Sequence, residues 1–308
     1  MVKPLCAGVI AALAVGSIAL AQDRPQFKTE SELVVLHVTV TDRSGSYISG
    51  LPAQAFRVID ESRPQTPRFF LTEDAPVTVG LLIDSSGSMG PVRDRVIAAA
   101  AEFVASGNPQ DEVFALVFND DVRPVLTGGR PFTSDADTLR SALSSAFEPR
   151  GRTALYDAVA HGLAYVANGT RDRRVLVVLS DGGDNASKAN FNDVLTGVQA
   201  SNTVIYTVAL ADPLDPDANP KRLGRLAETS GGEAFAPRDV AEVRRAFQQI
   251  SRDVRHSYTI GYEPLHPDSR AGFHRVRVDV KSPDGRGLRV RSRAGYLIGR
   301  ADARTDER

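Results

Sequence analysis

Apolar and polar positions change their periodicity twice along the chain. Between residues 77 and 255, short apolar runs such as VTVGLLI (77–83), VFALVF (113–118) and RVLVVLS (174–180) alternate with longer segments whose apolar residues recur every three or four positions. Short continuous apolar runs are typical of strands buried on both faces, and the longer segments are typical of amphipathic helices. The alternation predicts an α/β fold with a doubly wound, mostly parallel sheet covered by helices.

The segment VRPVLT (122–127) is an exception within this block. It follows the apolar run 113–118 after a very short turn. Parallel neighbours need a long crossover connection, whereas antiparallel neighbours do not. We therefore expect an antiparallel strand at one edge of the sheet.

The segments on either side of the block alternate apolar with polar residues, as in ELVVLHVTVTD (32–42) and FHRVRVDV (273–280). This alternation indicates strands with one buried and one solvated face. Each flank is too short to be stable alone, so we expect the two to complete one another as one β domain.

The N-terminal residues have the pattern of an export signal. Lys3 precedes an apolar stretch, and Ala19, Leu20 and Ala21 form the small-x-small pattern that predicts cleavage before Gln22. No later segment approaches the roughly 18 apolar residues of a membrane span, so we expect an exported protein, periplasmic or extracellular, without stable membrane insertion. The expected organisation is a signal peptide (1–21), an N-terminal β segment (22–75), an α/β domain (76–255), a C-terminal β segment (256–300) and a polar tail (301–308).

Composition narrows the possible partners. The 308 residues carry a formal net charge of -1, which gives no basic field for nucleic acid or for an anionic membrane. The single cysteine, Cys6, lies inside the expected signal, so the mature chain is expected to have no disulfide.

Oxygen-bearing side chains gather where strands are expected to end. Asp84, Ser86 and Ser88 follow the run 77–83, Asp181 follows the run 174–180, and Thr153 precedes a predicted helix. Ligands of open parallel sheets bind beyond the carboxyl ends of the strands, where the winding reverses. We expect both carboxylates at this solvent-facing edge.

Two carboxylates and three hydroxyls suit a hard cation such as Mg²⁺, Mn²⁺ or Ca²⁺. The five histidines are scattered and the mature chain has no cysteine, which argues against zinc or copper. The alternative interpretation is structural, because Ser and Thr at such positions also cap helices.

The sequence DSSGSM (84–89), with the separated Thr153 and Asp181, resembles the metal-ion-dependent adhesion site of von Willebrand factor type A domains. The resemblance implies that Ser86, Ser88 and Thr153 coordinate Mg²⁺, or Mn²⁺ or Ca²⁺, through their hydroxyls, while Asp84 and Asp181 act mainly through water. It also implies an open coordination position for an Asp or Glu of a partner. The flanking β segments are similar to those of an exported bacterial family related to these domains.

The function we expect is an exported adhesion module that binds an acidic group of a protein or peptide through the cation. A metal-assisted hydrolase and an A-domain subunit of a larger assembly are the alternatives. Catalysis is disfavoured because the sequence has no GxSxG motif and no histidine in a strand-end motif. Neighbouring loop residues are expected to select the acidic ligand: Asn119, Asp120, Arg150, Arg152 and Asn185.

Overall fold

The computed structural model describes residues 33–72, 74–129, 131–210, 218–264, 272–282, 285 and 287–298. The signal peptide expected at 1–21 and the polar tail expected at 301–308 lie outside the described residues. Among the helices that are described, none has the length and apolar character needed to cross a membrane.

The central sheet has the strand order β10-β9-β8-β5-β6-β7. Its strands are β5 (Val77–Asp84), β6 (Glu112–Phe118), β7 (Val122–Pro124), β8 (Arg173–Ser180), β9 (Thr203–Ala209) and β10 (Ala234–Phe235). All neighbours are parallel except β6 and β7, which pair antiparallel at one edge. The expected antiparallel edge strand is therefore confirmed.

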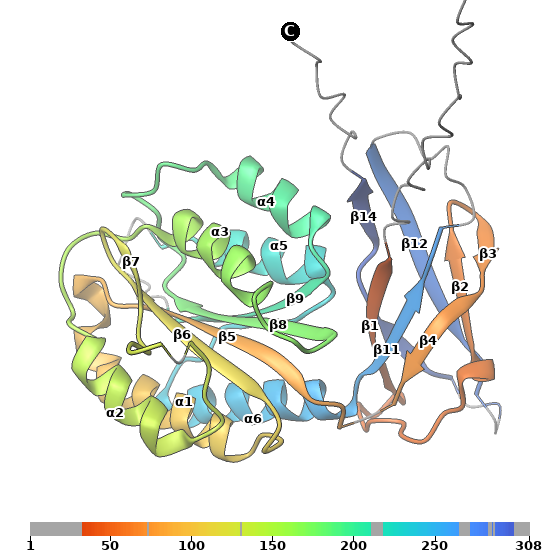
Figure 1. Ribbon diagram of the computed structural model, residues 1–308, viewed down its shortest axis with the longest axis horizontal. Coiled ribbons are helices and arrows are strands. Elements are labelled where there is room, and N and C mark those ends of the chain that lie inside the picture. The colour runs from red at the N-terminus through yellow and green to blue at the C-terminus, as the bar shows by residue number, and fades with distance from the viewer. Residues whose placement is uncertain are drawn as a thin grey trace, which may run out of the picture. The chain divides into compact units, whose positions relative to one another are not determined.

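Helices cover both faces of this sheet (Figure 1). They are α1 (Arg93–Ala105), α2 (Ala136–Ala146), α3 (Leu155–Val166), α4 (Phe191–Ala200), α5 (Pro220–Ser230) and α6 (Val240–His256). One apolar core lies between the sheet and α1, α2 and α6, and a second lies between the sheet and α3, α4 and α5. Strand β5 is buried along its whole length because it contributes side chains to both cores. The predicted doubly wound α/β fold is confirmed.

The winding of the sheet reverses between β5 and β8. These strands are parallel neighbours, but the chain passes from β5 through α1 to β6 on one side, and from β8 through α4 to β9 on the other. The loops that leave their carboxyl ends therefore diverge. Such a point of divergence is where open α/β sheets bind ligands.

The flanking segments form two four-stranded antiparallel sheets around a third apolar core. One sheet has the order β13-β1-β11-β4 and the other β14-β12-β2-β3. The strands are β1 (Val34–Thr41), β2 (Phe56–Asp60), β3 (Arg63–Gln65), β4 (Pro67–Leu71), β11 (Tyr258–Tyr262), β12 (Gly272–Val280), β13 (Arg289–Arg291) and β14 (Gly295–Ile298).

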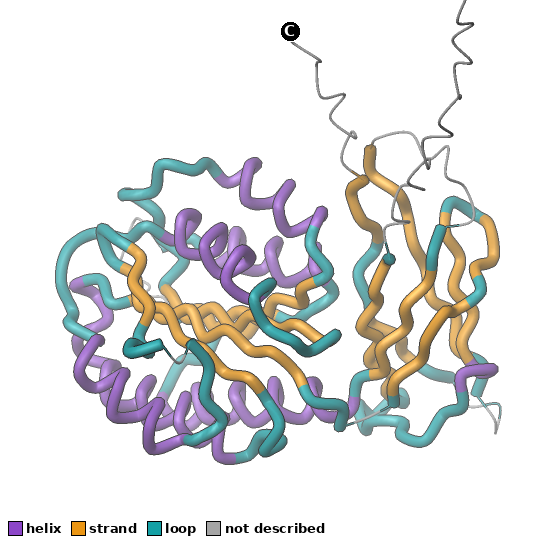
Figure 2. The backbone as a smooth tube through the Cα atoms, in the orientation of Figure 1, coloured by secondary structure: helices purple, strands orange, loops and turns teal. Residues whose placement is uncertain are grey.

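Each of these sheets contains strands from both flanks, so the prediction that the flanks combine is confirmed. Figure 2 shows the contrast between this strand-rich region and the helix-covered central sheet. Two short 3-10 turns complete the described elements, η1 (Ala53–Ala55) among the flanking strands and η2 (Gly87–Val92) after β5.

The chain enters and leaves the α/β domain at neighbouring points. The backbone N–H of Asp74, just before β5, donates to the carbonyl of Arg255 near the end of α6 (2.8 Å). The Arg255 guanidinium also pairs with Asp74 (3.2 Å) and with Asp111 (2.9 Å). The α/β domain is thus held as an insertion whose two ends are fastened together.

Buried arginines join the flanking sheets to the α/β domain. Arg293, 4% exposed, donates to the carbonyls of Gln199 (2.5 Å) and Ser201 (2.6 Å) at the end of α4. Arg173, at the start of β8, donates to the carbonyl of Val254 (2.5 Å) in α6 and to the hydroxyl of Ser257, the residue before β11. These contacts lie at the amino ends of β8 and β9, which leaves the carboxyl ends open.

Candidate metal centre

Asp84, the last residue of β5, is fully buried and has both carboxylate oxygens engaged. Oδ1 accepts from the backbone N–H of Ser86 (2.8 Å), and Oδ2 accepts from the hydroxyl of Ser180 at the end of β8 (2.7 Å). Burial raises the pKa of Asp84 to about 6, against the opposing effect of these hydrogen bonds. The expectation of a solvent-facing carboxylate is wrong for this residue, because β5 is central and its end is covered by neighbouring loops.

Ser86, Ser88 and Asp181 present a row of oxygen atoms. The hydroxyls of Ser86 and Ser88 are 3.1 Å apart, and the Ser88 hydroxyl donates to Asp181 Oδ2 (2.8 Å). Asp181 is itself 4% exposed, so it too departs from the expected exposed position, and its Oδ1 accepts from the N–H of Gly183 (2.9 Å). Two loops from different strands thereby place three side-chain oxygens next to one another.

Thr153 is held by its backbone. Its N–H donates to Asn185 Oδ1 (2.9 Å), and its carbonyl accepts from the N–H groups of Asn185 (3.0 Å) and Ala186 (3.1 Å). Its hydroxyl has no hydrogen-bond partner among the residues that the structure describes. The loop therefore fixes Thr153 while leaving its side-chain oxygen available.

Helix capping does not account for these hydroxyls. Ser86 is the N-cap of η2, but its side chain makes no capping hydrogen bond. The N-cap of α3 is Ala154, so Thr153 lies one residue outside the helix. The structural alternative raised by the sequence is wrong for both residues.

Four of the five predicted ligands line one pocket of about 190 Å³, and Asp84 lies behind it. The pocket is lined by Ser86, Gly87, Ser88, Gly151, Arg152, Thr153, Asp181, Gly183 and Asn185. Of the loop residues expected to select a ligand, Arg152 and Asn185 are in this wall. Asn119, Asp120 and Arg150 are not.

Asp120 and Arg150 have other roles. Asp120 pairs with the Arg152 side chain (3.0 Å) and accepts from its backbone N–H (3.2 Å), and these bonds lower the pKa of Asp120. The exposed Arg150 pairs with Glu148 (3.5 Å). The Asp120–Arg152 pair braces the loop that carries Thr153.

Three supporting residues were missed by sequence reasoning. Ser180 holds the Asp84 carboxylate, as described above. Asp157 in α3 accepts from the N–H groups of Lys188 and Ala189 (both 2.9 Å), and Ser187 donates to Asp184 (2.5 Å). Together Asp157 and Ser187 fix the loop that follows Asp181. Ser180 was detectable as a hydroxyl at a strand end, whereas Asp157 looks like an ordinary first-turn residue of a helix.

The donor set fits a small hard cation. Oxygens at adjacent positions of an octahedron around Mg²⁺ lie about 3 Å apart, given metal–oxygen distances of about 2.0–2.1 Å. The observed separations of 3.1 Å and 2.8 Å along the row Ser86–Ser88–Asp181 match this spacing. Within the described residues, no three His, Cys, Asp or Glu side chains gather, so a cation here would depend on hydroxyl oxygens.

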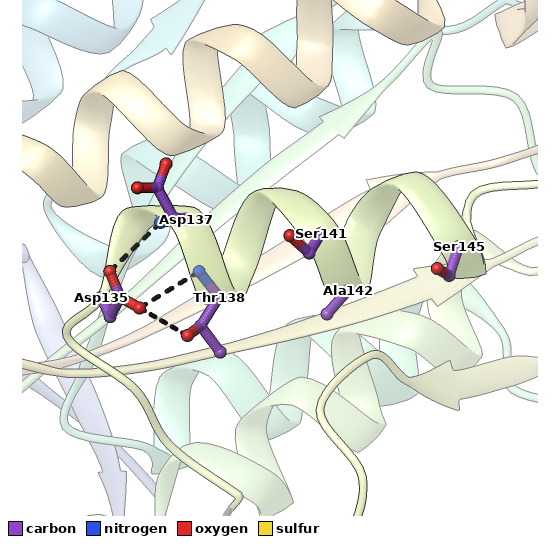
Figure 3. Close-up of a pocket in the computed structure, with 6 residues that line it drawn as sticks. All are labelled: Asp135, Asp137, Thr138, Ser141, Ala142 and Ser145. Atoms are coloured by element: carbon purple, nitrogen blue, oxygen red, sulfur yellow. Dashed lines mark hydrogen bonds between the residues drawn. The ribbon is translucent and has the colours of Figure 1, made fainter.

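A larger hollow of about 580 Å³ lies along α2 and contains none of the predicted ligands. Figure 3 shows that one of its two carboxylates, Asp135, is directed at the first turn of the helix. Asp135 accepts from the N–H groups of Asp137 and Thr138 (both 3.3 Å) and from the Thr138 hydroxyl (2.5 Å). These polar groups serve to begin the helix, and they indicate no ligand.

Comparison with protein families decides the classification of the chain. The family model described as von Willebrand factor type A domain matches residues 79–250. The chain belongs to this family. The matched residues run from β5 into α6 and so include all five predicted ligands of the A domain. No curated protein matches the chain significantly.

Solved structures similar to this chain include other A domains. The vWF domain of the type V pili tip protein Mfa5 from Porphyromonas gingivalis is 14% identical, covers 60% of this chain and 96% of its own, and has a TM-score of 0.49. A von Willebrand factor type A protein from Catenulispora acidiphila is 15% identical, with 89% and 76% coverage and a TM-score of 0.48. The PilB minor pilin from Streptococcus sanguinis is 11% identical, with 60% and 62% coverage and a TM-score of 0.46.

Proposed function

We propose that the A domain of this protein binds a divalent cation, Mg²⁺ in the first place, and uses it to bind an acidic side chain of a protein partner. The observation that carries the proposal is the row of Ser86, Ser88 and Asp181 oxygens at octahedral spacing. Thr153 adds a hydroxyl with no described partner in the same pocket.

Charge explains why the partner's group would be acidic. Asp181 is the one carboxylate among the described residues of the pocket wall, and Arg152 places a positive charge in the same wall. Asp84 does not line the pocket. It would act on the cation indirectly, because it accepts a hydrogen bond from the backbone N–H of Ser86 and so orients that residue. A dipositive ion held mainly by neutral oxygens stays undercompensated, so a carboxylate from outside would complete its coordination.

The described pocket wall offers little that catalysis would use. No histidine is among the described residues that line it, and the carboxylate that accepts from the Ser88 hydroxyl, Asp181, belongs to the proposed row of cation ligands. A serine nucleophile needs an adjacent general base, and a metal-bound water needs a group to accept its proton. Binding is therefore the function that these residues support, in preference to hydrolysis.

Titration calorimetry with Mg²⁺, Mn²⁺ and Ca²⁺ tests the cation. We expect Ser88→Ala and Asp181→Ala each to weaken binding strongly, because each removes an oxygen of the row. Ser141→Ala and Asp137→Ala on α2 are matched controls with the same chemical changes away from the pocket. Equal Mg²⁺ affinity in all four variants and the wild type would exclude the site.

Affinity capture from the parent cell's envelope and medium tests the partner. We expect proteins that bind in Mg²⁺ to elute with EDTA, and Thr153→Ala to retain fewer of them. If the partners bind equally well in Mg²⁺, in EDTA and to Thr153→Ala, the ion is only structural or the protein is a subunit of a larger assembly. Metal-dependent adhesion would then be wrong. The proposed export of the protein is checked separately, because the N-terminal residue of the secreted or periplasmic form should be Gln22.

A further inference from the structure

A second hollow of about 440 Å³ adjoins the metal pocket and shares Ser88 with it. It lies over the start of α1, the end of β9 and the start of α6, and α1 and α6 cover the same face of the sheet (Figure 1). Its volume is within the range of about 300–1,000 Å³ typical of ligand pockets. We call this hollow the α1–α6 groove.

The α1–α6 groove is mostly apolar. Its apolar lining residues are Pro91, Val92, Val96, Leu210, Pro237 and Val243. Val96 and Val243 are buried and continue into the core beneath, whereas Pro91 is exposed. The groove therefore offers an apolar side chain a partly covered place directly beside Ser88.

Two arginines give the groove a positive rim. Arg95 and Arg238 are exposed, and neither guanidinium has a hydrogen-bond or ion-pair partner within the described part of the chain. The nearby acids have hydrogen bonds of their own. Asp239 in the groove caps α6 by accepting from Glu242 N–H (2.8 Å), and Glu242 accepts from the backbone N–H of Arg238 (2.8 Å) and pairs with Arg245 (3.4 Å), so neither carboxylate pairs with a guanidinium of the groove.

Two other described arginines, Arg152 in the wall of the metal pocket and Arg222 farther from it, are already engaged. Arg152 pairs with Asp120 (3.0 Å). Arg222 donates to the Tyr156 hydroxyl and lies over the rings of Tyr156 (5.5 Å) and Phe191 (5.7 Å). Among the described arginines that line the pocket or the groove, Arg95 and Arg238 thus carry the unpaired positive charge, on the groove side.

We propose that the α1–α6 groove binds the part of the protein partner adjoining the metal-bound carboxylate, as an extended acidic segment. An apolar side chain of this segment would lie on the groove floor, and a second carboxylate would pair with Arg95 and Arg238. Charge complementarity selects this occupant, because a neutral or basic segment would leave both guanidiniums unpaired. The inference rests on the proposed function and adds a spacing requirement, two acidic residues separated by an apolar one.

A peptide array in Mg²⁺ tests the groove. Each short peptide carries one fixed Asp in a Gly–Ser background, with Glu, Lys or Leu placed at each neighbouring position in turn. We expect a Glu at one spacing to strengthen wild-type binding about three- to tenfold, and Leu between the two acids to strengthen it further. The double variant Arg95→Ala/Arg238→Ala should lose the gain from Glu but keep Mg²⁺-dependent binding of the Asp-only peptide.

The matched control is Arg140→Ala/Arg225→Ala, which removes two exposed arginines outside the groove. If Glu still strengthens peptide binding to Arg95→Ala/Arg238→Ala, or if the control variant loses this effect equally, the proposed role of the groove is wrong. The proposed metal-dependent function would be unaffected by either result. Peptides that bind equally with Mg²⁺ and with EDTA, or none that binds, would count against both.

Discussion

Ser88 donates a hydrogen bond of 2.8 Å to Asp181, although 93 positions separate the two residues in the sequence. Each lies in the loop that leaves the carboxyl end of a strand, and the two strands are the neighbours at which the winding of the sheet reverses. The contact is therefore a direct product of the topology. Ser88 also connects the candidate metal pocket with the α1–α6 groove, because it lines both.

Asp84 should contribute more to stability than its place at a strand end suggests. Replacing it with Ala leaves the N–H of Ser86 and the hydroxyl of Ser180 without their acceptor inside a fully buried site. We expect Asp84→Ala to lower the free energy of unfolding by about 1–3 kcal/mol. Asp84→Asn should lose less, since its carbonyl oxygen can still accept from Ser86. Urea unfolding without added metal measures both, and equal losses in the two variants would contradict the assigned hydrogen bonds.

Gly151 should be essential to the shape of the loop that carries Thr153. Its φ is +73°, and a Cβ atom there would lie 1.9 Å from Asp120 Oδ2, which would break the Asp120–Arg152 pair. Gly45 is the matched control, with φ +89° and open space around its Cβ position. Gly45→Ala should cost about 1–2 kcal/mol from backbone strain alone. We expect Gly151→Ala to cost more and also to weaken Mg²⁺ binding, as measured by urea unfolding and calorimetry; equal costs would show that the loop adapts.

His37 on β1 should contribute a loss of stability in mild acid. Burial and the charges of Arg173 and Arg293 lower the pKa of His37 from 6.5 to about 3, and its Nε2 atom is buried without a described partner. Below pH 6.5, the pKa of His37 in the unfolded state, the unfolded chain takes up a proton that the folded chain does not. The contribution of His37 to stability is therefore fully present above pH 6.5 and decreases as the pH falls. The expected contribution of His37 to the slope is about 1.4 kcal/mol per pH unit, and Asp84, whose pKa is raised to about 6, contributes with the opposite sign below that pH.

Urea unfolding between about pH 4 and pH 7 measures this slope. His37→Gln should make the curve flatter by that amount. The control is His161→Gln, on an exposed face of α3, which should leave the curve of the wild type in place. An unchanged slope in His37→Gln would assign the acid sensitivity to other groups.

The proposed domain boundaries can be tested by separating the two parts. Because strands of both flanks interleave in each outer sheet, residues 32–72 joined by a short linker to residues 257–298 should fold as a β domain. Residues 76–255 should fold alone and keep Mg²⁺ binding, since their two cores are internal. NMR spectra with dispersed amide signals are expected for both pieces. If the joined flanks are disordered while the isolated A domain is folded, the outer sheets need contacts with the A domain to fold.

The strand pattern and the oxygen-rich strand ends were predictable because both depend on local sequence. Apolar runs predicted the buried parallel strands, and alternation predicted the outer sheets. The burial of Asp84 was not predictable, since it depends on Ser180 from a neighbouring strand that is distant in sequence. The α1–α6 groove was equally hidden, because Arg95 and Arg238 meet only when α6 packs beside α1.

The A domain is connected to the rest of the protein by two chain segments, so a mechanical force on the domain would be carried by both. Its first strand, β5, and its last helix, α6, leave through adjacent segments that Asp74 and Arg255 bind together. A pull on a ligand held at the opposite edge of the sheet would divide between the central strand and the helix before it reached the outer sheets. The hydrogen bonds of β5 with β6 and β8 would then be loaded in shear, many at once, instead of being opened one after another.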